Sequence, residues 1–183
     1  MHAMERYVAV IGPGDATDAE VLLATEVGER LATRGAIVVT GGLGGVMAAA
    51  LVGAERQQGR TLSLLPGPDR RAAVAPATIV VPTSLGQLRN GLLVNAVDGI
   101  VAVGGSWGTL SEVALARRAD RPVVWISGWT IRDANGHGVE LATADSAASA
   151  VEMVLGQIEE KPAQMEEKLA QIEERGVAGR RAD

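Results

Sequence analysis

The chain has 183 residues, 47% of them hydrophobic and 21% charged, so it can bury a sizeable core and does not belong to the disordered class. Its 17 basic and 22 acidic residues leave a net charge of −5, which argues against a protein that binds nucleic acid or a membrane surface. The absence of cysteine excludes disulfides, thiolate metal sites and cysteine nucleophiles. Two histidines are too few for an imidazole cluster, so we expect no metal site.

Short runs of β-branched residues alternate along the chain with longer segments of helical pattern. In chain order, the expected strands are Tyr7–Ile11, Ile37–Thr40, Thr61–Leu65, Thr78–Val81, Ile100–Val103 and Val123–Ile126, with a further short strand near Val139–Leu141. The expected helices are Asp18–Arg34, Val46–Gln58, Leu85–Ala96, Leu110–Arg118 and Ser146–Glu160. Because the strands lack polar alternation and helices separate most of them, the pattern predicts a parallel sheet covered on both faces. The predicted fold is a doubly wound, Rossmann-like α/β domain.

The domain is expected to occupy residues 1–160, and a helical, partly disordered tail to occupy residues 161–183. Pro162 interrupts the last helical pattern, and Met165, Leu169 and Ile172 then form a thin apolar stripe. Such a stripe fits either a solvated helix or a helix that docks on a neighbouring subunit.

One uncharged stretch, Gly35–Ala54, is long enough to cross a bilayer. The glycine run Gly41–Gly45 would break a spanning helix, so we interpret the stretch as strand, turn and helix. The first residues, Met1–Arg6, have no signal-peptide architecture, and we expect a cytoplasmic protein without membrane partners.

Three glycine-rich segments, Gly12–Asp15, Gly41–Gly45 and Gly104–Thr109, each follow a predicted strand and precede a helix. Ligands of open parallel sheets bind at the carboxyl ends of the strands, where such loops lie. Glycine permits close backbone approach, and the following helix offers free N–H groups with positive partial charge. We therefore expect the loops to converge on a phosphate site, although any one of them could serve only as a tight turn.

Known nucleotide fingerprints do not fit these loops. No GxxxxGK[ST] motif is present, which excludes P-loop ATP hydrolysis, and neither Gly12-x-Gly14 nor Gly42-x-Gly44 has the third glycine of a dinucleotide motif. NAD binding is therefore disfavoured.

Two charged residues are candidates for chemistry. Glu112 lies three residues after Thr109, which is the spacing of a helix capping box and matches Thr17 and Glu20 near the first helix. Arg89 is expected on an apolar helix face with Leu85, Leu92, Leu93 and Ala96. A guanidinium in that position needs an anion, either a ligand phosphate or a buried carboxylate, unless it reaches solvent.

Three motifs in this order resemble those of the LOG-like (LONELY GUY) superfamily, and more closely its branch that contains the molybdenum cofactor carrier protein. They are Gly41–Met47, Leu88-Arg89-Asn90 and Gly105–Glu112, and the resemblance runs from about Tyr7 to Leu155. Gly104-Gly105-Ser106 stands where the LOG enzymes have Pro-Gly-Gly, and Asn90 stands where they have a basic residue. Both departures are typical of the carrier-like branch.

The resemblance implies a homodimer or homotetramer that binds a phosphorylated nucleotide or pterin and requires no obligatory cofactor. Arg89 and Glu112 match the pair that assists cleavage of the N-glycosidic bond in the LOG enzymes. The residues expected to bind the ligand are Gly12, Gly14, Gly41, Gly42, Gly44, Gly45, Met47, Asn90, Gly105, Ser106, Trp107, Gly108 and Thr109.

Three functions remain open at this point. The first is a carrier that binds a nucleoside monophosphate or the molybdenum cofactor, with phosphate held by the glycine loops and the heterocycle near Trp107. The second is a phosphoribohydrolase that acts on a nucleoside 5′-monophosphate with Glu112 and Arg89. The third is an oligomer whose nucleotide site is vestigial.

Overall fold

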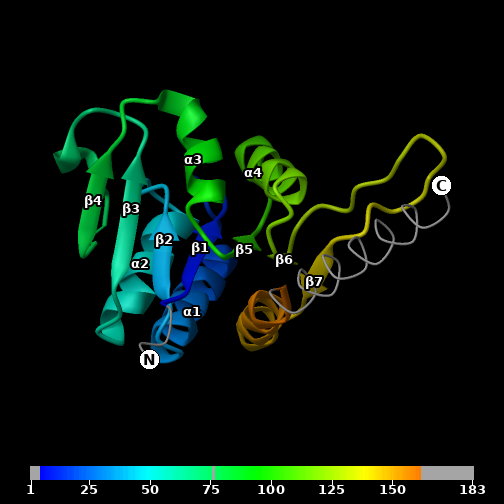
Figure 1. Ribbon diagram of the computed structural model, residues 1–183, viewed down its shortest axis with the longest axis horizontal. Coiled ribbons are helices and arrows are strands. Elements are labelled where there is room, and N and C mark those ends of the chain that lie inside the picture. The colour runs from blue at the N-terminus through cyan, green and yellow to red at the C-terminus, as the bar shows by residue number, and fades with distance from the viewer. Residues whose placement is uncertain (1–4, 76, 162–183) are drawn as a thin grey trace, which may run out of the picture.

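A computed structural model of the chain describes residues 5–75 and 77–161. Its centre is a seven-stranded sheet in which all neighbouring strands are parallel, in the order β4-β3-β2-β1-β5-β6-β7 (Figure 1). The strands are β1 (Tyr7–Ile11), β2 (Ile37–Thr40), β3 (Thr61–Leu65), β4 (Ile79–Pro82), β5 (Gly99–Val103), β6 (Val123–Ile126) and β7 (Ala142–Ala144). The helices are α1 (Asp18–Thr33), α2 (Val46–Arg56), α3 (Arg89–Asn95), α4 (Trp107–Arg118) and a helix over 147–161, with short 3-10 turns η1 (Arg70–Ala72) and η2 (Gly86–Leu88).

Helices cover both faces of the sheet, as alternation along β1 illustrates. Val8 and Val10 belong to one buried cluster with α1, α2 and the helix over 147–161, whereas Ala9 and Ile11 belong to another with α3 and α4. Successive side chains of a strand point to opposite faces, so a strand buried on both sides is apolar throughout. The predicted doubly wound, Rossmann-like class is therefore confirmed.

Four strand predictions match the structure residue for residue, namely those for β1, β2, β3 and β6. The uncharged stretch Gly35–Ala54 contains β2, a turn and the start of α2, as expected, and no helix among the described residues is long and apolar enough to cross a membrane. The tail predicted over 161–183 lies outside the described residues, except for Lys161 at the end of the last helix.

Three predicted elements differ most from the structure, whereas β4, β5, α1, α2 and the start of the last helix differ by one or two residues at an end. The helix expected over Leu85–Ala96 is interrupted, because Ser84 and Gly86 have positive φ values of 57° and 53° and only η2 and the short α3 form. The helix expected from Leu110 begins at Trp107, since Ser106 caps it. The last short strand is Ala142–Ala144 and follows the segment where it was expected.

The carboxyl ends of the parallel strands share one edge, so the glycine-rich loops meet there. The loops after β1 and β2 are joined directly, because the Val46 backbone N–H donates to the Pro13 carbonyl at 3.1 Å. Gly45 has a φ of 61° and lies against the Pro13 and Gly14 carbonyls, which leaves no room for a side chain. The chain reverses its direction of winding between β1 and β5, and the crevice of such a fold opens at this point.

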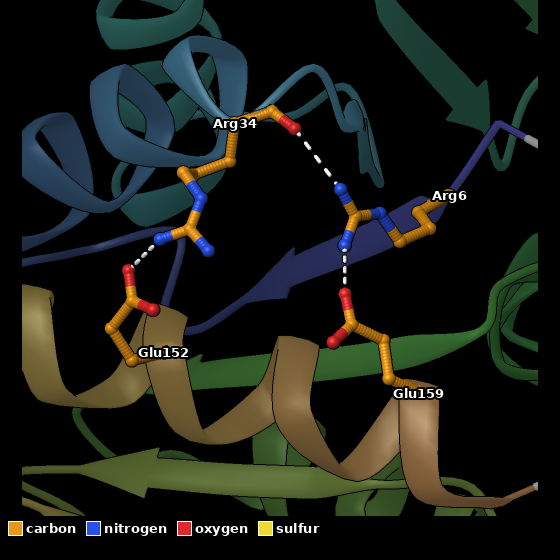
Figure 2. A network of polar contacts seen from close by, with 4 residues as sticks. All are labelled: Arg6, Arg34, Glu152 and Glu159. Atoms are coloured by element: carbon orange, nitrogen blue, oxygen red, sulfur yellow. Dashed lines mark hydrogen bonds and ion pairs between the residues drawn. The ribbon is translucent and has the colours of Figure 1, made fainter. Parts of the chain in front are cut away.

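At the opposite edge, polar contacts attach the last helix to the start of β1 and the end of α1 (Figure 2). Arg6 Nη1 lies 2.6 Å from Glu159 Oε1, Arg6 Nη2 donates to the Arg34 carbonyl at 3.3 Å, and Arg34 pairs with Glu152. These pairs are largely exposed, so each contributes on the order of 1 kcal/mol or less. They connect elements that are remote from the glycine loops.

Close packing of α1 on α2 depends on Gly28, and this gives a stability test. A Cβ atom on Gly28 would lie 2.9 Å from the Ala50 carbonyl carbon and 3.0 Å from its Cα, so Gly28→Ala must push the two helices apart. We expect a loss of about 1–3 kcal/mol in the free energy of unfolding, measured by urea denaturation.

The matched control is Gly156→Ala in the helix over 147–161, where a Cβ atom meets nothing within 4 Å. This variant should gain up to about 1 kcal/mol, because alanine has the higher helix propensity. Equal stability of the two variants would contradict the packing described for α1 and α2.

Candidate functional site

A pocket of about 230 Å³ lies at the carboxyl edge of the sheet, where the winding reverses. The loop after β1, the start of α2, the end of β3, η2 with the start of α3, and the first turns of α4 all contribute to its walls. The lining residues are Gly12, Gly14, Met47, Pro66, Gly86, Gln87, Arg89, Asn90, Ser106, Gly108, Thr109 and Glu112. The walls carry one cation, Arg89, and one carboxyl group, Glu112.

Arg89 is the first residue of α3 and is only 5% exposed. Its guanidinium lies against Gly41, where a Cβ atom would be 2.6 Å from Nη1 and 2.7 Å from Nη2. Within the described part of the chain, Nε and Nη1 are buried without a hydrogen-bond acceptor. A buried cationic donor without an acceptor is costly, and here two nitrogen atoms of one guanidinium lack acceptors.

Glu112 supplies the nearest carboxylate but does not fill that need. Its Oε1 lies 3.7 Å from Arg89 Nη1, which is an ion-pair distance and too long for a hydrogen bond. Glu112 is itself 8% exposed and projects from α4 into the same pocket. The charges of Arg89 and Glu112 are thus close enough to attract each other, and a ligand atom can bridge the space between the two side chains.

The capping-box interpretation of Thr109 and Glu112 is wrong. Because α4 begins at Trp107, its N-cap is Ser106, whose Oγ accepts from the Thr109 backbone N–H at 3.1 Å. Glu112 therefore lies a further turn into the helix, where its side chain has no capping role. The same interpretation of Thr17 and Glu20 is confirmed, because both reciprocal hydrogen bonds are present there.

Burial changes the acid–base properties of both charged groups. Burial raises the pKa of Glu112 to about 7, and the positive charge of Arg89 opposes that rise. Burial also lowers the pKa of Arg89, although the neighbouring carboxylate works in the other direction. Glu112 can therefore carry or release a proton near neutral pH while it faces a cation.

Several glycines of the predicted site are explained by internal packing. A Cβ atom on Gly12 would lie 2.7 Å from Val46 Cβ, and Gly42 has a φ of 71° and packs against Leu65. Gly104 has a φ of 65° and lies against Glu20. At these positions, glycine is required by the fold whether or not a ligand is present.

Gly14 and Gly108 are different, because they line the pocket and packing does not require them. Nothing lies within 4 Å of a Cβ atom placed on Gly14, and only Ser106 Oγ, at 3.6 Å, approaches one on Gly108. Both glycines leave open space on the pocket side of a helix N-terminus. Backbone N–H groups there are accessible to a ligand.

The structure brings together nine of the residues singled out from the sequence: Gly12, Gly14, Met47, Arg89, Asn90, Ser106, Gly108, Thr109 and Glu112. Six others do not line the pocket, namely Gly41, Gly42, Gly44, Gly45, Gly105 and Trp107. Gly41 nevertheless contacts the guanidinium directly. Among the described residues, no group of three or more acidic or histidine side chains could hold a metal ion.

Sequence reasoning missed Pro66, Gly86 and Gln87, which complete the wall beside Arg89. The assumption of a continuous helix from Leu85 concealed them, and Gly86 was the available signal for a break. The predicted apolar face of that helix is also corrected. Leu93 is buried with Arg89, but Leu85, Leu92 and Ala96 are exposed.

The described fold belongs to the Rossmann-like α/β class, with a pocket at the position where that class binds its ligands. The chain belongs to the SLOG cluster4 family, whose model matches residues 5–168. This family match and the similar solved structures described next confirm the resemblance to the LOG-like superfamily and its carrier-like branch.

Solved structures of other proteins are similar to most of this chain, and two of them are described here. The molybdenum cofactor binding protein from Rippkaea orientalis is 28% identical with a TM-score of 0.75, and the match covers 85% of this chain and 98% of that one. The molybdenum cofactor carrier protein from Chlamydomonas reinhardtii is 32% identical with a TM-score of 0.71, over the same shares. An uncharacterised protein from Archaeoglobus fulgidus is 36% identical over 118 residues, which are 63% of this chain and 76% of that protein.

The raised pKa of Glu112 predicts how stability depends on pH. The folded protein favours the protonated carboxyl group of Glu112. The stabilisation that this group gives the fold is fully present below pH 4.5, the ordinary pKa of a glutamate, and is lost as the pH rises through about 7. Glu112→Gln keeps the group neutral, and its free energy of unfolding should exceed that of the wild type above pH 7 by on the order of 3 kcal/mol. Urea denaturation over this pH range measures the difference.

Glu26→Gln serves as the control, because Glu26 forms an exposed pair with Arg30 on α1. Loss of this exposed pair should change the free energy of unfolding by no more than about 1 kcal/mol. A Glu112→Gln curve that ran parallel to that of the wild type would refute the pKa assigned to Glu112.

Proposed function

We propose that the protein binds a small phosphorylated ligand, either a nucleoside monophosphate or the molybdenum cofactor, and acts as a carrier. The observation that carries this proposal is the buried guanidinium of Arg89, whose Nε and Nη1 lack acceptors within the described residues while the side chain lines the pocket. A phosphate oxygen supplies the acceptor that the protein itself does not, and arginine suits phosphate because its donors are fixed in a plane.

The first turn of α4 supports the same assignment. The Ser106 cap takes up the N–H groups of Thr109 and Leu110, which leaves those of Trp107 and Gly108 for a ligand. The helix N-terminus adds positive partial charge, and the open space beside Gly108 lets an anion approach the backbone. The phosphate would therefore lie between this turn and Arg89.

The solved relatives support a carrier role in particular. One is a molybdenum cofactor binding protein and the other a molybdenum cofactor carrier protein. We infer that the heterocycle of the ligand, a pterin or a purine, extends from the pocket toward Trp107, whose side chain is 80% exposed. Its chain neighbours Ser106 and Gly108 line the pocket, which keeps Trp107 within reach of a ligand that extends beyond the pocket wall.

A phosphoribohydrolase is the second candidate, and the Arg89–Glu112 pair favours it. A carboxyl group with a pKa of about 7 can orient a water molecule or stabilise positive charge on the ribose as the N-glycosidic bond breaks. Arg89 would hold the phosphate or the leaving side. This pair is the one that the resemblance to the LOG enzymes implies.

Binding of AMP and of molybdopterin, measured by calorimetry, tests the proposal. Arg89→Met removes the donors while it keeps an apolar stem, and we expect it to weaken binding at least tenfold, as loss of a charge-assisted hydrogen bond would. Arg56→Met is the control, because Arg56 pairs with Glu29 at the end of α2, away from the pocket lining. Unchanged affinity in Arg89→Met, or no heat with either compound, would reject the phosphate site.

The same mixtures separate a carrier from a hydrolase. A carrier leaves AMP intact, whereas a hydrolase releases free adenine. That release should vanish in Glu112→Ala and persist in Glu20→Ala, because Glu20 caps α1 and does not line the pocket. Release of adenine that depends on Glu112 and not on Glu20 would reject the carrier proposal in favour of the hydrolase.

We also propose that the protein forms a homodimer through the surface of β4, η2 and α3. Exposed apolar side chains gather on these elements: Ile79, Val81, Leu85, Leu88 and Leu92. Ile79 and Val81 pair with Leu62 and Leu64 and so lie on the sheet face that α3 only partly covers. A large exposed apolar patch of this kind is typical of a subunit interface.

Introduction of a charge into this apolar surface tests the dimer. Leu88 is 78% exposed, so Leu88→Glu should leave the fold intact and convert the protein to a monomer in sedimentation velocity. Leu22→Glu on α1 is matched in exposure, at 71%, and should keep the state of the wild type. A Leu88→Glu protein with the mass of the wild type would contradict this interface.

A further inference from the structure

Two tryptophans from β6 and the segment after it hold the turn between β5 and α4. The Trp125 indole Nε1–H donates to the Gly104 carbonyl at 2.6 Å. The Trp129 indole lies against the next residue, because a Cβ atom on Gly105 would be 2.9 Å from Trp129 Cε2. Gly105, expected at the ligand, is therefore a glycine because an indole occupies the space beside it.

Trp129 also contacts the first residue of α4. The rings of Trp107 and Trp129 are 5.1 Å apart, with planes at 80°, which is the edge-to-face arrangement that aromatic pairs prefer. Since Trp107 is 80% exposed, little else restrains its ring. Trp129 is thus the aromatic partner against which the Trp107 ring packs.

Trp129 belongs to a segment, 127–141, that projects from the sheet between β6 and β7 (Figure 1). The two arms of the segment are paired, because the Val139 N–H donates to the Ile131 carbonyl at 2.9 Å and the Asp133 N–H donates to the His137 carbonyl at 2.8 Å. A second cavity of about 310 Å³ lies beside it, with Trp125 and Trp129 in its wall. Trp129 therefore stands at the base of a preformed hairpin and is 39% exposed itself.

From these contacts we propose that Trp129 is a positioning residue for ligand recognition: it holds the Trp107 ring so that the heterocycle of a phosphorylated ligand stacks on it. The inference rests on the proposed function. It assigns part of the ligand specificity of the protein to the segment 127–141, which does not line the pocket. Stacking of a base on an aromatic side chain is favourable and tolerant of sequence or ring type. A displaced Trp107 would lose this contact while the phosphate site stayed intact.

Two ligands that differ only by the heterocycle separate this role from a general structural one. AMP and ribose 5-phosphate share the phosphate, and AMP alone can stack. Trp129→Ala should weaken AMP binding about tenfold and leave the affinity for ribose 5-phosphate unchanged. Trp129→Phe keeps an aromatic edge and should bind AMP nearly as the wild type does, and Trp107→Ala should match Trp129→Ala.

The outcomes distinguish failure of this inference from failure of the proposed function. Wild-type protein that binds neither compound rejects the phosphate site and, with it, the inference. Binding of AMP no tighter than ribose 5-phosphate, or an equal loss for both in Trp129→Ala, rejects the stacking role alone. The ring pair has its own readout, because coupled indoles give an exciton band in circular dichroism that must disappear in both Trp107→Phe and Trp129→Phe.

Discussion

The guanidinium of Arg89 lies between the backbone of Gly41 and the carboxyl group of Glu112, buried and with two nitrogen atoms lacking acceptors in the described structure. A folded protein tolerates such a group when a ligand completes its hydrogen bonds or when nearby charge offsets its burial. Glu112 offers only part of that compensation, because its Oε1 lies 3.7 Å from Arg89 Nη1, which is too long for a hydrogen bond. This one side chain thus contacts the loop after β2 and faces a carboxyl group of α4.

The parallel sheet explains why the pocket forms where it does. All strands end at one edge, so loops distant in sequence meet there, and the winding reverses between β1 and β5. Glycines then serve two separate purposes. Gly12 and Gly45 let the loops pack against one another, whereas Gly14 and Gly108 leave free space in front of the backbone. A count of glycines in the sequence does not separate these purposes, because only tertiary contacts distinguish them.

The sheet was predictable from sequence because strands such as β1 and β5 are continuous apolar runs bounded by glycine, a local pattern with one interpretation. The pairing of Arg89 with Glu112 was implied by the resemblance to the LOG enzymes, but residue patterns alone did not give it, since it depends on where α4 begins. A start at Leu110 would make Thr109 the cap, and the actual cap at Ser106 shifts Glu112 into the pocket. Similarly, Gln87 lines the pocket because the expected helix is broken, and Trp129 contacts Trp107 from a projecting hairpin. Neither the break nor the hairpin leaves a periodic signal in the sequence.

We propose that the anion of the ligand occupies the acceptor position missing at Arg89. Nuclear magnetic resonance of the arginine Nε–H groups observes this directly, with AMP and adenosine added in separate titrations. We expect the Arg89 Nε–H resonance to shift with AMP and to stay in place with adenosine, which lacks the phosphate. An Arg89 resonance that does not move when AMP saturates the protein, or that moves equally with adenosine, would contradict it.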